Sequence, residues 1–323
     1  MKRLAGILAL ALATATAAPT LRAQPAPPPM KAEKLADGVW AAQPEKGANV
    51  GWFLFGDGVM AVDSGGDAAT GKQILDLIAE TTSGKPVRAL VLTHLHADHT
   101  GGARAFAAAG ARIICQENVA AQVLALVGQA ATDPSDPLAG KANLRPVVES
   151  LSERAILVDG VHNVQIYFLG AAHTRADLIV YLATDKILFS GDIALNGLLP
   201  FMQSPDMDPI GWERALSAIA HVAPEKMVPG HGPIGPVSGI ADSLAYVRRV
   251  VEISKKVVDH GIRDELLDAE IRAPENRIEN VPLSDSHLAN VKTSVRILRE
   301  RAQKKTMPGA PAAPTPGRTP APR

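Results

Sequence analysis

The chain has 323 residues, enough for one large domain or two small ones. Apolar residues make up 46% and charged residues 20%, which is ordinary for a soluble globular protein. Basic and acidic residues both number 33, so the formal net charge is zero and nothing in it points to nucleic acid or to an electrostatically attracted partner.

Residues 1–23 are typical of a secretory signal peptide. Lys2 and Arg3 precede an apolar run over 4–18, and small residues follow up to Ala23. This apolar run is shorter than the roughly 20 residues that cross a bilayer as a helix. We therefore expect a periplasmic or secreted protein with no stable membrane anchor.

A linker, a C-terminal tail and a single cysteine are not expected to take part in chemistry. Residues 24–35 are interpreted as the linker, and the Pro/Ala-rich residues 306–323 as a disordered tail that cannot bury apolar surface. Cys115 is the only cysteine, so an intramolecular disulfide cannot form, and its apolar neighbours predict a buried packing role.

The first half of the chain alternates strand-like and helix-like segments. Apolar runs bounded by turn residues predict strands over 38–42, 50–56, 58–65, 87–93 and 111–116. Apolar residues at helical spacing predict helices within 69–85, 101–110 and 117–129.

The second half repeats this order of strands and helices. Strands are predicted over 164–170, 178–183, 186–192 and 226–229. Asp208 followed by Pro209 is a helix-start signal. Two groups of strands, each followed by helices, predict an α/β fold in which two sheets pack face to face with helices outside.

Two long helices are predicted after the last strand. Ser238 is expected to cap the first, which ends at Gly261, and Ser284 is expected to cap the second. We expect these helices to pack on the sheets or to form a wall near a functional site.

Three histidines and one aspartate lie close together directly after the strand predicted over 87–93. Histidines two residues apart on an extended segment point the same way, so His94 and His96 can bind one ion. Asp98 and His99 come where the chain turns into a helix, and they can face a second ion. The alternative, a polar surface loop, would not require this density of ligand-type side chains.

Three more candidate ligands directly follow apolar strands, and glycines stand beside two of them. These candidates are His173, Asp192 and His231. A neighbouring glycine allows backbone and ligands to approach closely. This placement is typical of ligands that converge on one edge of a sheet sandwich.

The ordered set of these residues resembles the metallo-beta-lactamase fold superfamily. The residues that carry the resemblance are His94, His96, Asp98, His99, His173, Asp192 and His231, and Asp63 matches the acidic residue ahead of the histidine cluster. The resemblance implies a four-layer αββα sandwich over residues 36–235, with the metals at one edge. It leaves residues 236–305 as extra C-terminal helices packed on that domain.

The resemblance also implies two zinc ions per chain and a role for each residue. His94, His96 and His173 would bind the first ion, and Asp98, His99 and His231 the second. Asp192 would bridge the two ions. Asp63 would orient a ligand or the backbone beside them.

The activity that the resemblance implies is hydrolysis of an amide, lactone or ester bond in a small-molecule substrate. Two ions would lower the pKa of a water molecule towards ~7, and Asp98 would hold this water and move protons. The apolar residues Leu198, Leu199 and Phe201 are expected to form a hydrophobic wall for the substrate.

Two positions depart from most true beta-lactamases of this superfamily. Asp192 stands where those enzymes commonly have cysteine or serine, and Leu195 stands where many have a lysine that holds the carboxylate of the drug. Two alternatives therefore stay open. One is a thioester hydrolase of the glyoxalase-II type, and the other is a non-hydrolytic iron-binding redox or sensing protein.

Other polar residues receive structural interpretations. Thr174 and Asp177 are expected to shape the loop after His173. The motif HLANV over 287–291 is similar to a group of periplasmic metallohydrolases. The histidines outside the ligand set are expected to lie at the surface or in packing positions, with His287 a possible pocket residue: His162, His221, His260 and His287.

Overall fold

The computed structural model describes residues 30–306 apart from 130, 132 and 142–144. The predicted signal peptide, residues 24–29 of the predicted linker and the tail beyond residue 306 lie outside these residues. Within the part of the chain that is described, no helix combines the length and the apolar character needed to cross a membrane.

Within the described residues, twelve strands form two sheets. The first sheet has seven strands in chain order: β1 (Glu33–Ala36), β2 (Val39–Ala42), β3 (Val50–Phe55), β4 (Gly58–Val62), β5 (Val87–Val91), β6 (Arg112–Gln116) and β7 (Val148–Leu151). The second sheet has five strands in the order β12 (Lys226–Pro229), β11 (Ile187–Gly191), β10 (Leu178–Leu182), β9 (Asn163–Phe168) and β8 (Arg154–Val158). Strand β1 begins at Glu33, so the first sheet starts within the predicted linker, before the predicted domain boundary at residue 36.

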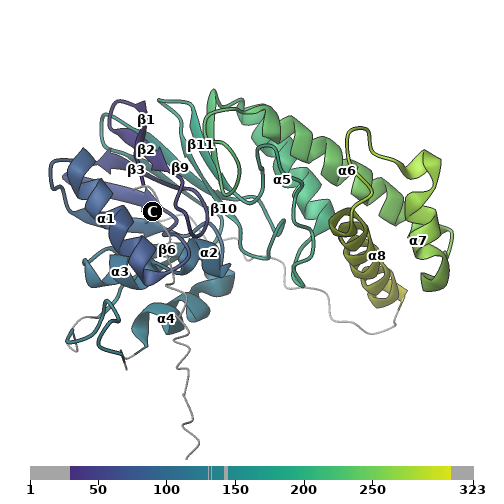
Figure 1. Ribbon diagram of the computed structural model, residues 1–323, viewed down its shortest axis with the longest axis horizontal. Helices are drawn as coiled ribbons and strands as arrows, with labels where there is room; N and C mark the ends of the chain where they lie inside the picture. Colours follow the sequence, from purple (N-terminus) through teal and green to yellow (C-terminus); the bar gives the residue numbers. More distant parts are fainter. Residues whose placement is uncertain (1–29, 130, 132, 142–144, 307–323) are drawn as a thin grey trace, which may run out of the picture.

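Helices cover the outer face of each sheet, so the fold has the four layers that the sequence predicts (Figure 1). The first sheet is covered by α1 (Ala68–Thr81), α3 (Ala103–Ala108) and α4 (Ala120–Gly128), which follows the short η1 (Glu117–Val119). The second is covered by α5 (Pro209–Val222) and α6 (Ser238–Asp259). The short α2 (Ala97–Thr100) lies in the loop after β5.

Three apolar clusters fill the spaces between these layers, and the alternation of side chains along the strands produces them. In β4, Val59 and Ala61 pack against the helices, whereas Met60 and Val62 pack between the sheets. In β10, Ile179 and Tyr181 pack against the helices that cover the second sheet. Each central strand is therefore apolar on both faces.

The strand directions bring several carboxyl ends to one edge of the sandwich. In the first sheet β4 and β5 are parallel. In the second sheet β11 and β12 are parallel, and β9 runs the same way as β11 because both are antiparallel to β10. The loops that leave β4, β5, β9, β11 and β12 can therefore meet, and these loops carry the residues that resemble metal ligands.

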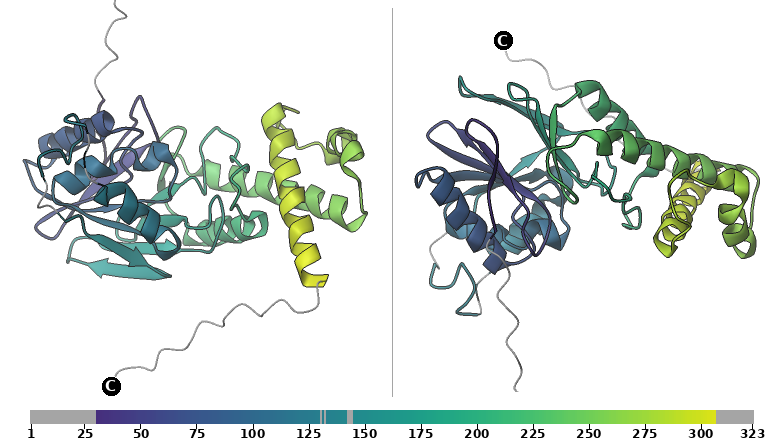
Figure 2. Two further views of the ribbon diagram at one scale, coloured as in Figure 1. Left: turned by 90° about the horizontal axis from the view of Figure 1, so that it is seen from below. Right: turned by 45° about the horizontal axis from the view of Figure 1, so that its top comes forward.

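The C-terminal helices continue the layer outside the second sheet. Figure 2 shows the long α6 running from the sandwich towards α7 (Asp264–Arg272) and α8 (Asp285–Thr306), with the short η2 (Pro274–Asn276) between these two. Apolar residues of α5, α6, α7 and α8 share one core with the second sheet. These helices are thus part of the packed fold.

Three of the four helix-boundary signals that the sequence offers are confirmed. The Asp208 side chain accepts hydrogen bonds from two backbone N–H groups at the start of α5, and the Ser284 hydroxyl accepts one from the His287 N–H at 3.2 Å. Gly261, with φ +60°, follows the end of α6. The prediction that Ser238 caps α6 is wrong: Val237 is the N-cap residue, and it makes no side-chain cap hydrogen bond.

Candidate metal centre

The cluster of histidines sits in a tight turn after β5. His96 is the N-cap residue of α2, so the chain leaves the strand, extends through the first histidines and then begins to coil. The turn packs backbone to backbone against the loop after β4: a Cβ on Gly101 would lie 2.1 Å from the carbonyl oxygen of Gly66. Only glycine fits there, and its lack of a side chain allows the two loops to pack this closely.

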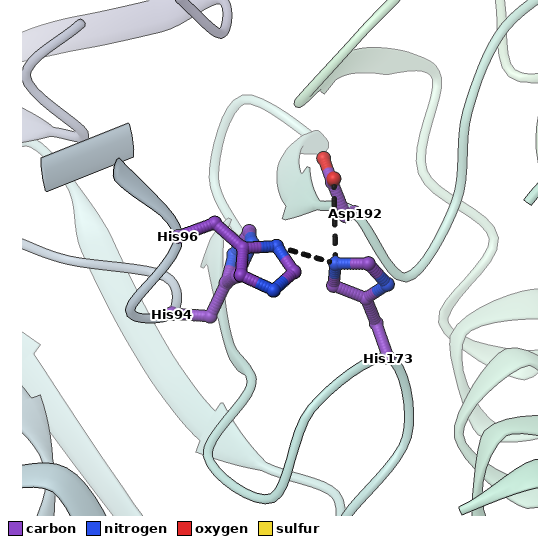
Figure 3. A group of neighbouring side chains, drawn as sticks. All are labelled: His94, His96, His173 and Asp192. Carbon is purple, nitrogen blue, oxygen red and sulfur yellow. Dashed lines mark hydrogen bonds and ion pairs between the residues drawn. The ribbon is translucent and has the colours of Figure 1, made fainter. Parts of the chain in front are cut away.

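The first group of ligand-type side chains comprises His94, His96, His173 and Asp192, and their ligand atoms lie within 4.8 Å of one another (Figure 3). The Nδ1 atom of His96 is 3.0 Å from both His94 Nε2 and His173 Nε2. His173 Nε2 is 3.5 Å from Asp192 Oδ2. Three imidazole nitrogens and one carboxylate oxygen therefore point at a common centre.

The second group comprises Asp98, His99 and His231. His231 Nε2 lies 3.0 Å from Asp98 Oδ2, and His99 Nε2 lies 3.8 Å from the same oxygen. Asp192 also reaches this group, with Oδ1 at 3.3 Å from His99 Nε2 and Oδ2 at 3.7 Å from His231 Nε2. The carboxylate of Asp192 is thus the part of the site that lies next to both groups.

Two buried atoms of this cluster have no hydrogen-bond partner: His99 Nε2 and Asp192 Oδ1. A buried polar atom without a partner costs free energy, so such atoms in a folded protein call for a ligand or an ion. Imidazole nitrogens and carboxylate oxygens are the donors that zinc and other divalent transition metals accept. The residues present therefore fit a metal centre.

Burial and neighbouring charges set the protonation of the first group. Burial lowers the pKa of His94, and the nearby His99 and His173 lower it further. Burial also lowers the pKa of His173 to about 4. Burial alone would raise the pKa of Asp192, but the adjacent imidazole of His99 and the charges of the surrounding histidines lower it. Neutral imidazoles and an ionised carboxylate are the forms that bind a metal.

Asp63 contacts His99 of the second group on the side of the ring that faces away from the other ligands. It follows β4 with φ +60°, an uncommon conformation for a residue other than glycine, and its Oδ2 atom lies 2.8 Å from His99 Nδ1. Its Oδ1 atom accepts a hydrogen bond from the Thr93 N–H at 2.8 Å. Burial lowers the pKa of His99, but the Asp63 and Asp192 carboxylates outweigh this effect and raise it. A carboxylate on Nδ1 leaves Nε2 of His99 to face the metal site.

The loop that carries His173 is ordered by Asp177. The buried carboxylate of Asp177 accepts hydrogen bonds from Ala172 N, Thr174 N and Thr174 Oγ1, which bears out the structural interpretation of Thr174 and Asp177. Burial raises the pKa of Asp177 to about 7. The network fixes the backbone on both sides of His173.

A cavity of about 530 Å³ opens beside the metal groups. Leu195, Leu198, Leu199 and Phe201 give it an apolar wall, while Asp98 is among the groups on its polar side. The start of α8 supplies Ser284, Ser286 and Asn290 to the lining. None of the described residues that line the cavity is lysine or arginine.

Residues 45–231 match the metallo-beta-lactamase superfamily. This match covers more than half of the chain and includes every candidate ligand.

The chain belongs to the metallo-beta-lactamase superfamily.

The chain is similar to several proteins of known name. A linear primary-alkylsulfatase from Pseudomonas sp. is 24% identical over 284 residues, 74% of this chain and 53% of its own length. A type 2 metallo-beta-lactamase from Bacteroides fragilis is 29% identical over 104 residues, 31% of this chain and 41% of its own length. The chain thus spans about half the length of these curated relatives. A metallo-beta-lactamase from Pontibacter korlensis shares the fold, with a TM-score of 0.56 and 23% identity over 68% of this chain and 99% of its own.

The structure brings all seven candidate ligands of this metallo-beta-lactamase fold into one site, and it places the other singled-out residues elsewhere. Cys115 is buried, and burial raises the pKa of its thiol to about 11. His162 is buried against Asp185. His287 is also buried and bonds to Tyr246, and it is not among the residues that line the cavity.

Three side chains that hold the ligand loops were not predicted from the sequence. Asn49 Nδ2 donates to the carbonyl oxygens of Pro229 and Gly232, on either side of His231. Thr93 bonds to Asp63, and Ser204 Oγ lies 3.3 Å from His96 Nε2. These contacts join segments far apart in the chain, so no local pattern marks them.

We expect the purified protein to contain two divalent ions per chain. Seven ligand-type residues in two groups, joined by one carboxylate, are sufficient for two ions. Elemental analysis after gentle purification would measure this content directly. Fewer than one ion per chain, also after dialysis against zinc, would contradict the assignment of the site.

Proposed function

We propose that this protein is an exported dinuclear zinc hydrolase that cleaves an ester, lactone or thioester bond next to an apolar group. The observation that carries the proposal is the juxtaposition of the two ligand groups with an apolar cavity that no lysine or arginine lines among the described residues. The proposal retains the hydrolase activity implied by the superfamily and narrows the kind of substrate.

Bound divalent ions would supply an activated water for attack and would polarise the bond that breaks. His94, His96 and His173 would hold one ion, and Asp98, His99 and His231 the other, with Asp192 shared. Asp98 is the ligand best placed to move a proton. Its side chain is 41% exposed and lines the cavity, and its hydrogen bond from His231 lowers its pKa, so it is ionised near neutral pH.

The wall of the cavity favours an apolar substrate. Leu198 and Phe201 are 54% and 50% exposed, and both line the cavity beside the metal groups. Exposed apolar side chains grouped at a site gain free energy when a ligand covers them. Leu195 is buried in the wall and offers no charge to a carboxylate.

A sulfate ester is a second candidate substrate. The similarity to the alkylsulfatase covers 74% of this chain and so extends beyond residues 45–231, which the superfamily match covers. An alkyl sulfate would offer the same apolar chain to the cavity, but its charge would have to be met by the ions. A lysine or arginine to assist is lacking among the described lining residues, so we rank the neutral ester first.

The location and the partners of the protein are part of the proposal. The signal-peptide pattern over residues 1–23 supports a periplasmic or secreted enzyme, and zinc rather than iron suits a ligand set rich in imidazole outside the cell. The expected partner is a small-molecule substrate.

We expect higher kcat/KM on an apolar carboxylic ester, lactone or thioester than on a cephalosporin. Without a cation for the drug's carboxylate, binding loses a charge-assisted hydrogen bond, which corresponds to ~10- to 150-fold in affinity. The measurement is a side-by-side comparison of these substrates and of a medium-chain alkyl sulfate, with zinc present. A hundredfold preference for the cephalosporin would contradict the proposal, and a preference for the alkyl sulfate would favour the second candidate.

A further inference from the structure

The loop between β11 and α5 touches the metal ligands from the side of the cavity. The carbonyl oxygen of Phe201 lies 3.1 Å from His173 Nδ1, and Ser204 Oγ lies 3.3 Å from His96 Nε2. Each contact engages the ring nitrogen that points away from the metal group. When Nδ1 of His173 donates to Phe201, its Nε2 is free to bind an ion, so this loop selects the ligand form of the ring.

The side chain of Asn290 in α8 holds the part of this loop around Phe201. Asn290 is 1% exposed, and its amide nitrogen donates to the carbonyl oxygen of Pro200 at 2.8 Å. Its Oδ1 atom accepts hydrogen bonds from Met202 N at 3.0 Å and from Gln203 Nε2 at 3.3 Å. The bonds to Pro200 and Met202 enclose Phe201 on both sides, so Asn290 fixes the residue whose carbonyl oxygen meets His173.

The fourth hydrogen bond of Asn290 connects it to α6. Its Nδ2 atom donates to the hydroxyl of Tyr246 at 2.9 Å, and that hydroxyl lies 3.1 Å from His287 Nδ1. Burial raises the pKa of Tyr246 to about 12, which keeps the hydroxyl protonated. An amide side chain has two donor hydrogens and two acceptor positions on its oxygen, and all four are used here. Asn290 is therefore held in one orientation by the C-terminal helices.

We propose that Asn290 is a positioning residue of the metal centre: through residues 200–203 it holds Phe201 against His173, so the C-terminal helices complete the site that the sandwich begins. This inference rests on the metal centre of the proposed function but is independent of the substrate. The loop that Asn290 holds also carries Leu198 and Leu199 of the apolar wall, so the same residue links metal binding to the shape of the cavity.

The test is the stepwise affinity for Zn²⁺ of the full chain, measured by competition with a chelator, in Asn290→Ala and in a matched control. Asn276→Ala is the control, since Asn276 is also a buried asparagine of the C-terminal region, and its side-chain amide bonds to Glu270 and not to residues 200–203. We expect Asn290→Ala to lower the affinity for one of the two ions about tenfold, which is a typical loss when a residue that supports a metal ligand is removed. The control should bind both ions as the natural protein does.

Further measurements separate positioning from loss of stability. The thermal midpoint of each metal-free variant is compared with its Zn²⁺ affinity, because a purely structural role would lower the midpoints of both asparagine variants and leave the affinities alone. If Asn290→Ala does not fold, Tyr246→Phe removes only the hydroxyl that supports Asn290, and a loss of Zn²⁺ affinity without a change in secondary structure is expected. Unchanged affinity in the variant that folds would overturn the inference. If instead the natural protein binds no Zn²⁺, the proposed function fails first.

Discussion

Replacing Asp192 with alanine is expected to release at least one ion and to reduce turnover by more than about 100-fold, beyond the usual loss for an outer partner of a metal ligand. Asp192 lies next to both ligand groups, at 3.3 Å from His99 Nε2 and 3.5 Å from His173 Nε2. Its negative charge would offset the repulsion between two cations, and no other residue of the first group is acidic. Elemental analysis and kcat of the same preparation measure both effects.

The conservative control is Asp192→Cys, because a thiolate is also a good zinc ligand. This variant should retain part of the metal and some of the activity. If Asp192→Ala kept two ions and full turnover, the carboxylate would not be a shared ligand, and the ligand assignment at this position would be wrong.

Replacing Gly230 with alanine is expected to damage the metal centre almost as severely, although glycine has no side chain to bind a metal. A Cβ at this position would lie 1.9 Å from Asp192 Oδ1 and 2.9 Å from His99 Cε1. The added Cβ would displace the Asp192 carboxylate from its place between the two groups, and His99 is restrained by its contact with Asp63 on the opposite side of the ring. We expect loss of at least one ion and more than a tenfold decrease in kcat, by displacement of ligands.

Gly128→Ala provides the matched control, since an added Cβ in α4 meets its nearest neighbour at 3.9 Å. Circular dichroism should report the same fold for both variants, with metal content altered in Gly230→Ala alone. A Gly230→Ala protein with two ions and unchanged kcat would show that the loop around His231 can move away at little cost.

The sequence was most informative where chemistry follows directly on a regular element. Asp192 and His231 each come straight after an apolar strand, and strands β11 and β12 exist where they were expected. The convergence of these residues on one edge was predicted from their placement after strands, and the parallel pairing of β11 with β12 accounts for it. The glycine beside His231 also proved to be a site of close approach, as its position suggested.

Among the elements that were not predicted, two illustrate the effect of a weak local pattern. Strand β8 (Arg154–Val158) alternates between exposed and half-buried residues, and its apolar Ile156 and Val158 face outward, so the alternation is not one of apolar and polar side chains. Helix α7 (Asp264–Arg272) has no side-chain cap and buries only Leu267 and Ile271. Neither offers the periodicity on which sequence reasoning depends.

Part of the site could not be read from local sequence at all. Asn290 lies in the HLANV motif, but its role was not predicted, because its partners Pro200 and Tyr246 lie 90 and 44 residues away along the chain. Hydrogen bonds of this kind follow from the packing of α8 beside α6, which only the folded chain defines.

The ligands of the first group come from both sheets: His94 and His96 follow β5 of one sheet, and His173 and Asp192 follow β9 and β11 of the other. An ion bound there would act as a cross-link that holds the two halves of the sandwich together. Since unfolding would scatter its ligands, each tenfold rise in free zinc above the dissociation constant would add about 1.4 kcal/mol to the free energy of unfolding. The metal supply of the compartment would then determine how long the folded protein persists as well as how fast it works.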